Sequence, residues 1–152
     1  MGNNLKFNSS VCTNREQSQR LLDLGLKPET ADCMWCAVTK DAKGKEIPSK
    51  NIKWYLQAHT STSKQIVGFM DYTHIPAWSL HRLIELLPQS INLTNYADTH
   101  YYLVIKSSRV LYMNDYKEWL YYNDDTNYYN RLIDCIRWTM EQKLFNKEYL
   151  KQ

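Results

Sequence analysis

A helical apolar stripe between residues 129 and 144 constrains the fold more than any other feature of the sequence. At about 100° per residue, its six apolar side chains fall within about 120° of the helix circumference. They are Tyr129, Leu132, Ile133, Ile136, Met140 and Leu144. Asp125, Thr126 or Asn127 can cap the start of this helix, because each side chain accepts a hydrogen bond from an unpaired amide. The stripe predicts a helix that packs one face on a core.

Strand patterns occupy the middle of the sequence. In residues 51–58, Ile52, Trp54 and Leu56 alternate with the residues between them, the period of a strand with one solvent-exposed face. Further strands are expected at residues 33–39, 101–106, 110–113 and 118–122, with a short edge strand at residues 65–70. Residues 41–44, 107–109 and 114–115 provide turns between strands.

Two further helices are marked by their ends. Residues 13–16 (Thr-Asn-Arg-Glu) have the form of a capping box and predict a helix that Gly25 ends. Ser79 is a suitable N-cap for a short helix that Pro88 ends. Together these elements predict an α+β fold in a single domain over residues 1–152, with residues 1–12 as a candidate disordered segment. The domain would hold a mostly antiparallel sheet of about five strands and about three packed helices.

Composition excludes several classes of protein. The chain has 152 residues, of which 43% are hydrophobic and only eight are Gly or Pro, four of each. This balance excludes a disordered or linker protein. Because a backbone phosphate cradle needs several glycines, it also excludes nucleotide binding through a Gly-rich loop. No nucleophile elbow of the Gly-x-Ser-x-Gly type occurs, so the sequence indicates no catalytic residue and no cofactor.

The first residues contain no apolar core of signal-peptide length, and the longest apolar run, residues 101–105, fits a strand. We therefore expect a cytoplasmic protein with reduced cysteines and no membrane partner. The net charge is +3. Five lysines lie in residues 40–53, which read either as a solvated hairpin loop or as a weak phosphate-binding groove.

Three small clusters could carry chemistry. Cys33 and Cys36 have the spacing of zinc ligands or of a redox pair, but no second ligand pair accompanies them, so we interpret them as buried thiols. Asp71, His74 and His81 could act in a metal site or as a general base, but their spacing matches no known ligand set, so we favour surface or capping roles for them. The paired carboxylates of residues 124–125 precede the last helix and are interpreted as capping groups.

An aromatic cluster is the strongest functional signal. Seven Tyr or Trp residues lie within eighteen positions, namely Tyr112, Tyr116, Trp119, Tyr121, Tyr122, Tyr128 and Tyr129. They could line a strand-rich core, form a protein interface, or stack on bases or sugars. Trp138 lies off the main stripe of the last helix, so it is either covered by another element or faces a partner. The candidate interaction surface is Trp119, Tyr121, Tyr122 and Trp138.

Several segments in order resemble one family. They are residues 21–32 (LLDLGLKPETAD), 75–88 (IPAWSLHRLIELLP), 133–138 (IDCIRW) and 145–150 (FNKEYL). Over residues 20–150 the chain resembles small uncharacterised proteins of gut Bacteroidales bacteria and their phages or mobile elements. Those proteins tend to carry one cysteine where this chain has Cys33 and Cys36. The resemblance implies a bacterial, cytosolic setting and no particular chemistry.

Absent catalytic motifs and abundant Tyr and Trp favour a non-enzymatic binding or adaptor protein of a phage or mobile element. Its expected partner is an unidentified protein or a second copy of the chain. One alternative is a small hydrolase or nuclease that uses Asp71, His74 or His81. The other is a weak single-stranded nucleic-acid-binding protein that uses residues 40–53 and the Tyr cluster, which the mild net charge disfavours.

Overall fold

The computed structural model describes residues 10–58, 72–93 and 99–152. The first part of the chain holds α1 (Arg15–Asp23), β1 (Cys33–Val38), β2 (Trp54–Ala58) and β3 (Tyr72–Ala77). The second part holds α3 (Leu80–Leu86), β4 (Ser90–Leu93), β5 (Thr99–Lys106), β6 (Arg109–Met113), β7 (Trp119–Asn123) and α4 (Tyr128–Glu141). Short 3-10 turns lie at Pro28–Thr30, Ser49–Asn51 and Lys147–Tyr149.

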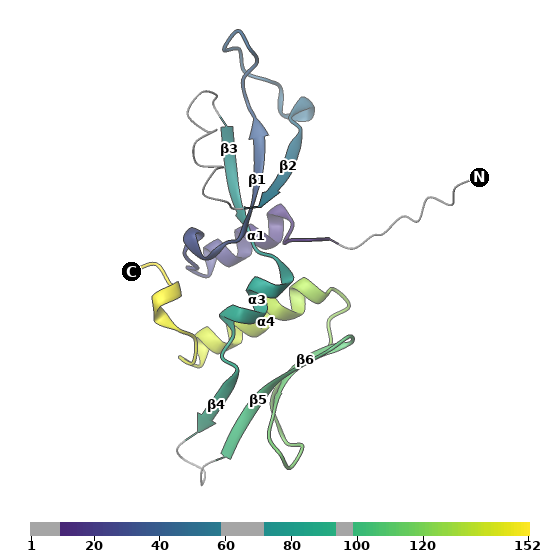
Figure 1. The fold of residues 1–152 in the computed structure, drawn as a ribbon, viewed down its shortest axis with the longest axis vertical. Coiled ribbons are helices and arrows are strands. Elements are labelled where there is room, and N and C mark those ends of the chain that lie inside the picture. The colour runs from purple at the N-terminus through teal and green to yellow at the C-terminus, as the bar shows by residue number, and fades with distance from the viewer. Residues whose placement is uncertain (1–9, 59–71, 94–98) are drawn as a thin grey trace, which may run out of the picture.

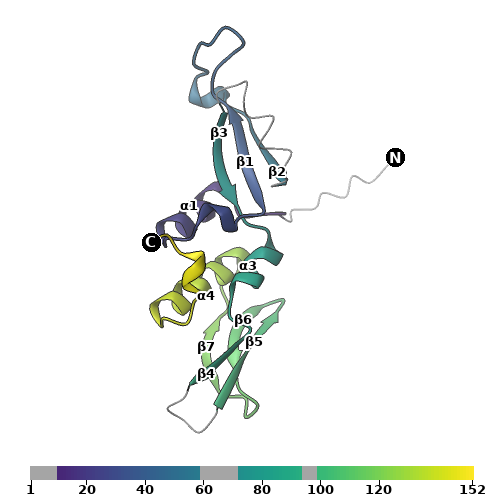
Figure 2. The same ribbon diagram turned by 60° about the vertical axis from the view of Figure 1, so that its left-hand side comes forward.

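The strands form two antiparallel sheets, ordered β2-β1-β3 and β4-β5-β6-β7. The three helices lie between the sheets, so that one sheet extends from each end of a helical centre (Figure 1, Figure 2). The predicted α+β class, the antiparallel pairing and the three helices are confirmed. Within the described residues there are seven strands in two sheets, where the sequence suggested about five in one sheet.

The two strands that the sequence analysis missed, β3 and β4, are both at sheet edges. Pro76 lies within β3, where it is tolerated because an edge strand leaves one row of amides unpaired. Strand β4 has only four residues, too few to show a clear period. The edge strand expected at residues 65–70 lies outside the described residues.

The helix ends follow the local sequence. The capping box of α1 is made by Asn14 and Gln17, one residue later than predicted, because Thr13 is fully buried and bonds elsewhere. Gly25 follows the helix with a φ of 91°, a conformation that favours glycine. Ser79 caps α3 and Asn127 caps α4, both as predicted.

One main core joins the three helices to the second sheet. Its fully buried members include Leu21 of α1, Trp78, Leu83 of α3, Leu132 of α4 and Val110 of β6. A smaller cluster of Cys12, Cys33 and Ala77 lies under the first sheet. Cys12 is therefore packed, although it belongs to the segment considered as disordered; residues 1–9 of that segment lie outside the described residues.

Contacts far apart in sequence close this core. α4 packs against α1, α3, β6 and β7, and the residues after it return to α1, where Leu150 pairs with Leu26. In the described part of the chain, no helix combines the length and apolarity needed to cross a membrane.

Candidate functional site

The second sheet has two chemically different faces. Paired residues of neighbouring strands share a face, so the register places Tyr101, Leu103, Tyr112 and Tyr121 together on the face that packs against α4. We call this the inner face. The opposite, outer face carries apolar residues from β5, β6 and β7, namely Tyr102, Val104, Leu111, Met113, Trp119 and Tyr122, together with the basic residues Lys106 and Arg109.

A β-bulge brings the two outer aromatic residues of β7 together. Tyr112 pairs with Tyr121 and Met113 pairs with Trp119, so Leu120 is an extra residue on β7. Without it, alternation would place Trp119 on the same face as Tyr121. With it, Trp119 joins Tyr122 on the outer face, and their rings stack with centroids 4.9 Å apart and planes 18° apart.

These outer rings are exposed to solvent. Trp119 is 59% exposed, Tyr102 45% and Tyr122 37%. Leu111, which lies among them on β6, is buried to 3% exposure. The outer face therefore has a buried aliphatic centre with exposed aromatic rings beside it. Single exposed apolar residues are ordinary on protein surfaces, but a group of neighbouring ones suggests an interaction site.

Arg109 lies at the edge of this aromatic group. Its guanidinium carbon is 5.7 Å from the centroid of Tyr122, within cation–π range. Its Nε is buried and has no hydrogen-bond partner among the described residues. The hydroxyl of Tyr122 donates to Asp124 at 3.0 Å, so that carboxylate is engaged beside the same ring. Arg109 thus places a positive charge beside the outer aromatic rings, while its buried Nε is out of reach of a partner.

The four residues predicted as an interaction surface separate onto two faces. Trp119 and Tyr122 lie on the outer face, but Tyr121 and Trp138 do not. Trp138 packs its ring 4.9 Å from that of Tyr121 and 5.7 Å from that of Tyr112, both measured between centroids. Trp138 is therefore covered by another element, the inner face of the second sheet, and does not face a partner. Burial also raises the pKa of the Tyr121 hydroxyl.

The cysteines occupy structural positions. Residues three apart in a strand point to opposite faces, so Cys33 packs with Cys12 while Cys36 donates to Gln57 at 3.6 Å. Burial raises the pKa of both Cys33 and Cys36. These thiols are protonated at neutral pH, which opposes metal binding and nucleophilic attack. The described residues contain no group of three or more His, Cys, Asp or Glu that could hold a metal ion.

The two candidate histidines lie on different elements. His74 pairs in register with Cys36 on β1, whereas His81 is an exposed residue of α3 whose Nε2 lies 3.0 Å from Glu85. Asp71 lies outside the described residues. Of the paired carboxylates, Asp125 accepts from the amide of Asn127 at 2.7 Å, which stabilises the turn before α4.

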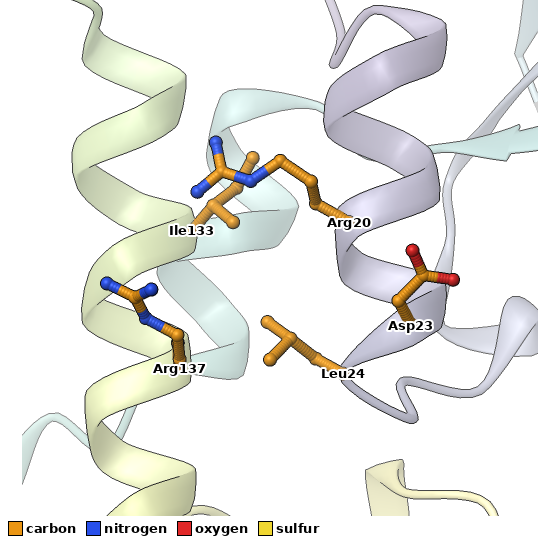
Figure 3. Close-up of a pocket in the computed structure, with 5 residues that line it drawn as sticks. All are labelled: Arg20, Asp23, Leu24, Ile133 and Arg137. Atoms are coloured by element: carbon orange, nitrogen blue, oxygen red, sulfur yellow. The ribbon is translucent and has the colours of Figure 1, made fainter.

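The structure also shows a pocket that the sequence analysis missed. It lies between α1 and α4, has a volume of about 240 Å³, and is lined by Arg20, Asp23, Leu24, Ile133 and Arg137 (Figure 3). Its two walls are more than a hundred residues apart in sequence, and no local pattern marks them as neighbours. The helical period of α4 does place Ile133 and Arg137 one turn apart, which is the only signal available.

Comparison with models of protein families, with curated proteins and with solved structures finds no match to this chain.

Proposed function

We propose that this chain is a non-enzymatic protein-binding module whose docking surface is the outer face of the second sheet. The partner we propose is a protein segment that presents an apolar side chain beside a carboxylate. The observation that carries this proposal is the exposed stack of Trp119 on Tyr122 next to the guanidinium of Arg109.

The residue types on this face are those that dominate binding energy in protein interfaces. Trp, Tyr and Arg are enriched among interface hot spots because they combine large, stiff contact area with a polar or charged group. Trp119, Tyr122 and Arg109 are adjacent here, and Leu111 and Met113 form an aliphatic floor beside them. A carboxylate from the partner would pair with the positive charge of the Arg109 guanidinium, and an apolar side chain would cover the rings.

The charge on this face favours a protein over a nucleic acid. A single-stranded nucleic acid needs cations along the path of its phosphates as well as aromatic rings. The outer face has Lys106 and Arg109 at the turn end of the β5–β6 hairpin. The negatively charged Asp124 accepts a hydrogen bond from the hydroxyl of Tyr122. Among the described strand residues of this face, phosphates would therefore meet Lys and Arg side chains at that end alone.

The sequence alternatives receive less support. The basic residues 40–53 include a hairpin turn in which Asp41 accepts the amides of Lys43 and Lys45 at 2.8 and 3.0 Å. A cytoplasmic location is part of our proposal and is supported by four free, buried thiols. An origin in a phage or mobile element remains a prediction from the sequence resemblance.

Selection from a phage-displayed peptide library tests the proposal. We expect enriched peptides that combine an acidic residue with an aliphatic or aromatic one, and that lose binding to Trp119→Ala and Arg109→Gln. Tyr55→Ala is the matched control, because Tyr55 is 55% exposed on the other sheet. Peptides that bind all four proteins equally would refute this docking surface.

Two further measurements distinguish a protein partner from a nucleic acid and from a second copy of the chain. Binding of oligo(dT) at low salt that is lost in Trp119→Ala would replace the protein partner with a nucleic acid. Sedimentation that shows a dimer of the wild-type chain and a monomer of Trp119→Ala would replace it with a second copy. Absence of both, with peptide enrichment, supports the proposal as stated.

A further inference from the structure

The pocket between α1 and α4 is lined by charged side chains and by two apolar ones. Arg20 and Asp23 belong to α1 and Leu24 caps it, while Ile133 and Arg137 belong to α4. Figure 3 shows both guanidinium groups on the α4 side of the pocket and the Asp23 carboxylate on the α1 side. The side chains of Leu24 and Ile133 lie between the helices.

The two arginines share one carboxylate. Asp134 Oδ1 lies 2.9 Å from Arg20 Nη2 and 3.4 Å from Arg137 Nη2. Because a single carboxylate cannot neutralise two guanidinium groups, this wall of the pocket keeps an excess of positive charge. Asp23 adds a negative charge on the opposite, α1 side of the pocket, where its carboxylate accepts from the side-chain amide of Gln19 at 2.8 Å, so the positive excess is confined to the arginine wall.

The two arginines have different roles. Arg20 bonds both to Asp134 and to Asn130 Oδ1, at 2.9 and 3.2 Å, and so ties α1 to α4. Arg137 is 53% exposed in its side chain, and its contact with Asp134 is its only ion pair in the part of the chain that the structure describes. Its guanidinium is therefore exposed and engaged by one described carboxylate, and a planar fork of this kind matches an oxyanion.

We propose that this pocket binds a small oxyanion, a carboxylate or a phosphate, that carries a short apolar group. Arg137 donates hydrogen bonds to the oxyanion, and Arg20 adds a second positive charge. The apolar group packs on Leu24 and Ile133. The volume of about 240 Å³ limits the ligand to a small molecule, because drug-sized ligands occupy larger pockets. This site is separate from the outer face of the second sheet.

The experiment is an NMR titration of the folded chain with three probes of similar shape. They are 3-methylbutanoate for the carboxylate, isopentyl phosphate for the phosphate, and 3-methylbutanamide as the neutral isostere. We expect saturable shifts of the Ile133 methyl and Arg137 Nε–Hε signals with at least one oxyanion and none with the amide. Saturation by only one oxyanion identifies which of the two the pocket takes.

Variants then test the assigned residues. Arg137→Gln should weaken oxyanion binding about tenfold, the value of one lost charge-assisted hydrogen bond. Arg137→Lys should bind the oxyanion more tightly than Arg137→Gln but less tightly than the wild type. Lysine keeps the positive charge but lacks the planar pair of donors of a guanidinium. Asp23→Asn should strengthen binding about twofold, because it removes an exposed negative charge from the pocket. Lys147→Gln is the control for loss of an exposed positive charge elsewhere.

Two results would overturn the proposal. One is the lack of saturation by either oxyanion below about 10 mM, the weak limit for a specific small-molecule site. The other is equal affinity of wild type and Arg137→Gln while both remain folded by circular dichroism. Equal shifts with the neutral amide would also overturn it, since they would show apolar binding alone.

Discussion

Two tryptophans near the second sheet should respond very differently to truncation. Trp138 lies against two tyrosine rings of the inner face, whereas Trp119 is 59% exposed on the outer face. We predict that Trp138→Ala destabilises the chain much more than Trp119→Ala does. The comparison decides which aromatic residues hold the fold together and which remain available to a partner.

The magnitudes follow from burial. Truncation of a core Trp to Ala costs about 3–5 kcal/mol, and Trp138 belongs near the lower end because it is half-buried. Trp119 has roughly two fifths of its area covered, or about 80 Å² of a ring that offers about 200 Å². At about 25 cal/mol per Å² this gives about 2 kcal/mol as an upper bound, so we expect about 1 kcal/mol.

Urea denaturation followed by far-ultraviolet circular dichroism measures both values without relying on tryptophan fluorescence. The expected difference of about 2 kcal/mol corresponds to about 4–8 °C in Tm for a chain of this size. Equal destabilisation by the two substitutions would refute the reasoning. It would mean that Trp119 is covered within the chain, and the outer face would then not be a docking surface.

Two other predictions concern buried polar groups. Thr13→Val should cost about 2 kcal/mol in urea denaturation, because the hydroxyl accepts from the amide of Trp78 at 3.0 Å and both residues are fully buried. The exposed Thr126→Val should change stability by less than about 0.5 kcal/mol, and equal effects would argue against this hydrogen bond. The four cysteines should react with a thiol reagent only after unfolding, even at pH 8–9, because all are buried and burial raises their pKa values. Rapid labelling of the native chain would contradict their burial.

Local signals in the sequence were sufficient for most helix ends and for the hairpins, although the capping box of α1 lies one residue later than predicted. The side chains of Ser79 and Asn127 each accept a hydrogen bond from the amide three residues later, and Gly25 ends α1 through its own positive φ. The residues that determine these helix ends are therefore close together in the sequence. The turn at residues 41–44 is confirmed for the same reason, since the amide of Gly44 donates to the carbonyl of Asp41 at 2.9 Å.

The division into two sheets and the position of Trp138 depend on distant contacts. A helical period assigns one buried face to α4, but α4 is packed by α1 and α3 and also by β6 and β7. A helix covered by several elements buries residues outside its main stripe, and Trp138 and Arg131 are both such residues. Arg131 is 4% exposed and donates to the carbonyl of Ser107 in the β5–β6 hairpin at 3.1 Å.

The candidate sites were predictable to different degrees. The Tyr and Trp density pointed to β7, but the sequence does not show the bulge at Leu120 that turns Trp119 and Tyr122 to the same side. For the pocket of Arg20 and Arg137, the sequence indicates only that Ile133 and Arg137 lie one helical turn apart. The pocket exists because α1 and α4 pack against each other. No local sequence pattern predicts that these two helices are neighbours.

The ion pair between Arg20 and Asp134 joins residues 114 positions apart, and the main core spans the same separation. Chain entropy opposes such distant contacts during folding until nearer ones have shortened the loop. The β5–β6 and β6–β7 hairpins are local and can form first, together with α4. We therefore expect α1 to dock onto α4 late in folding, and the pocket to take shape with that docking.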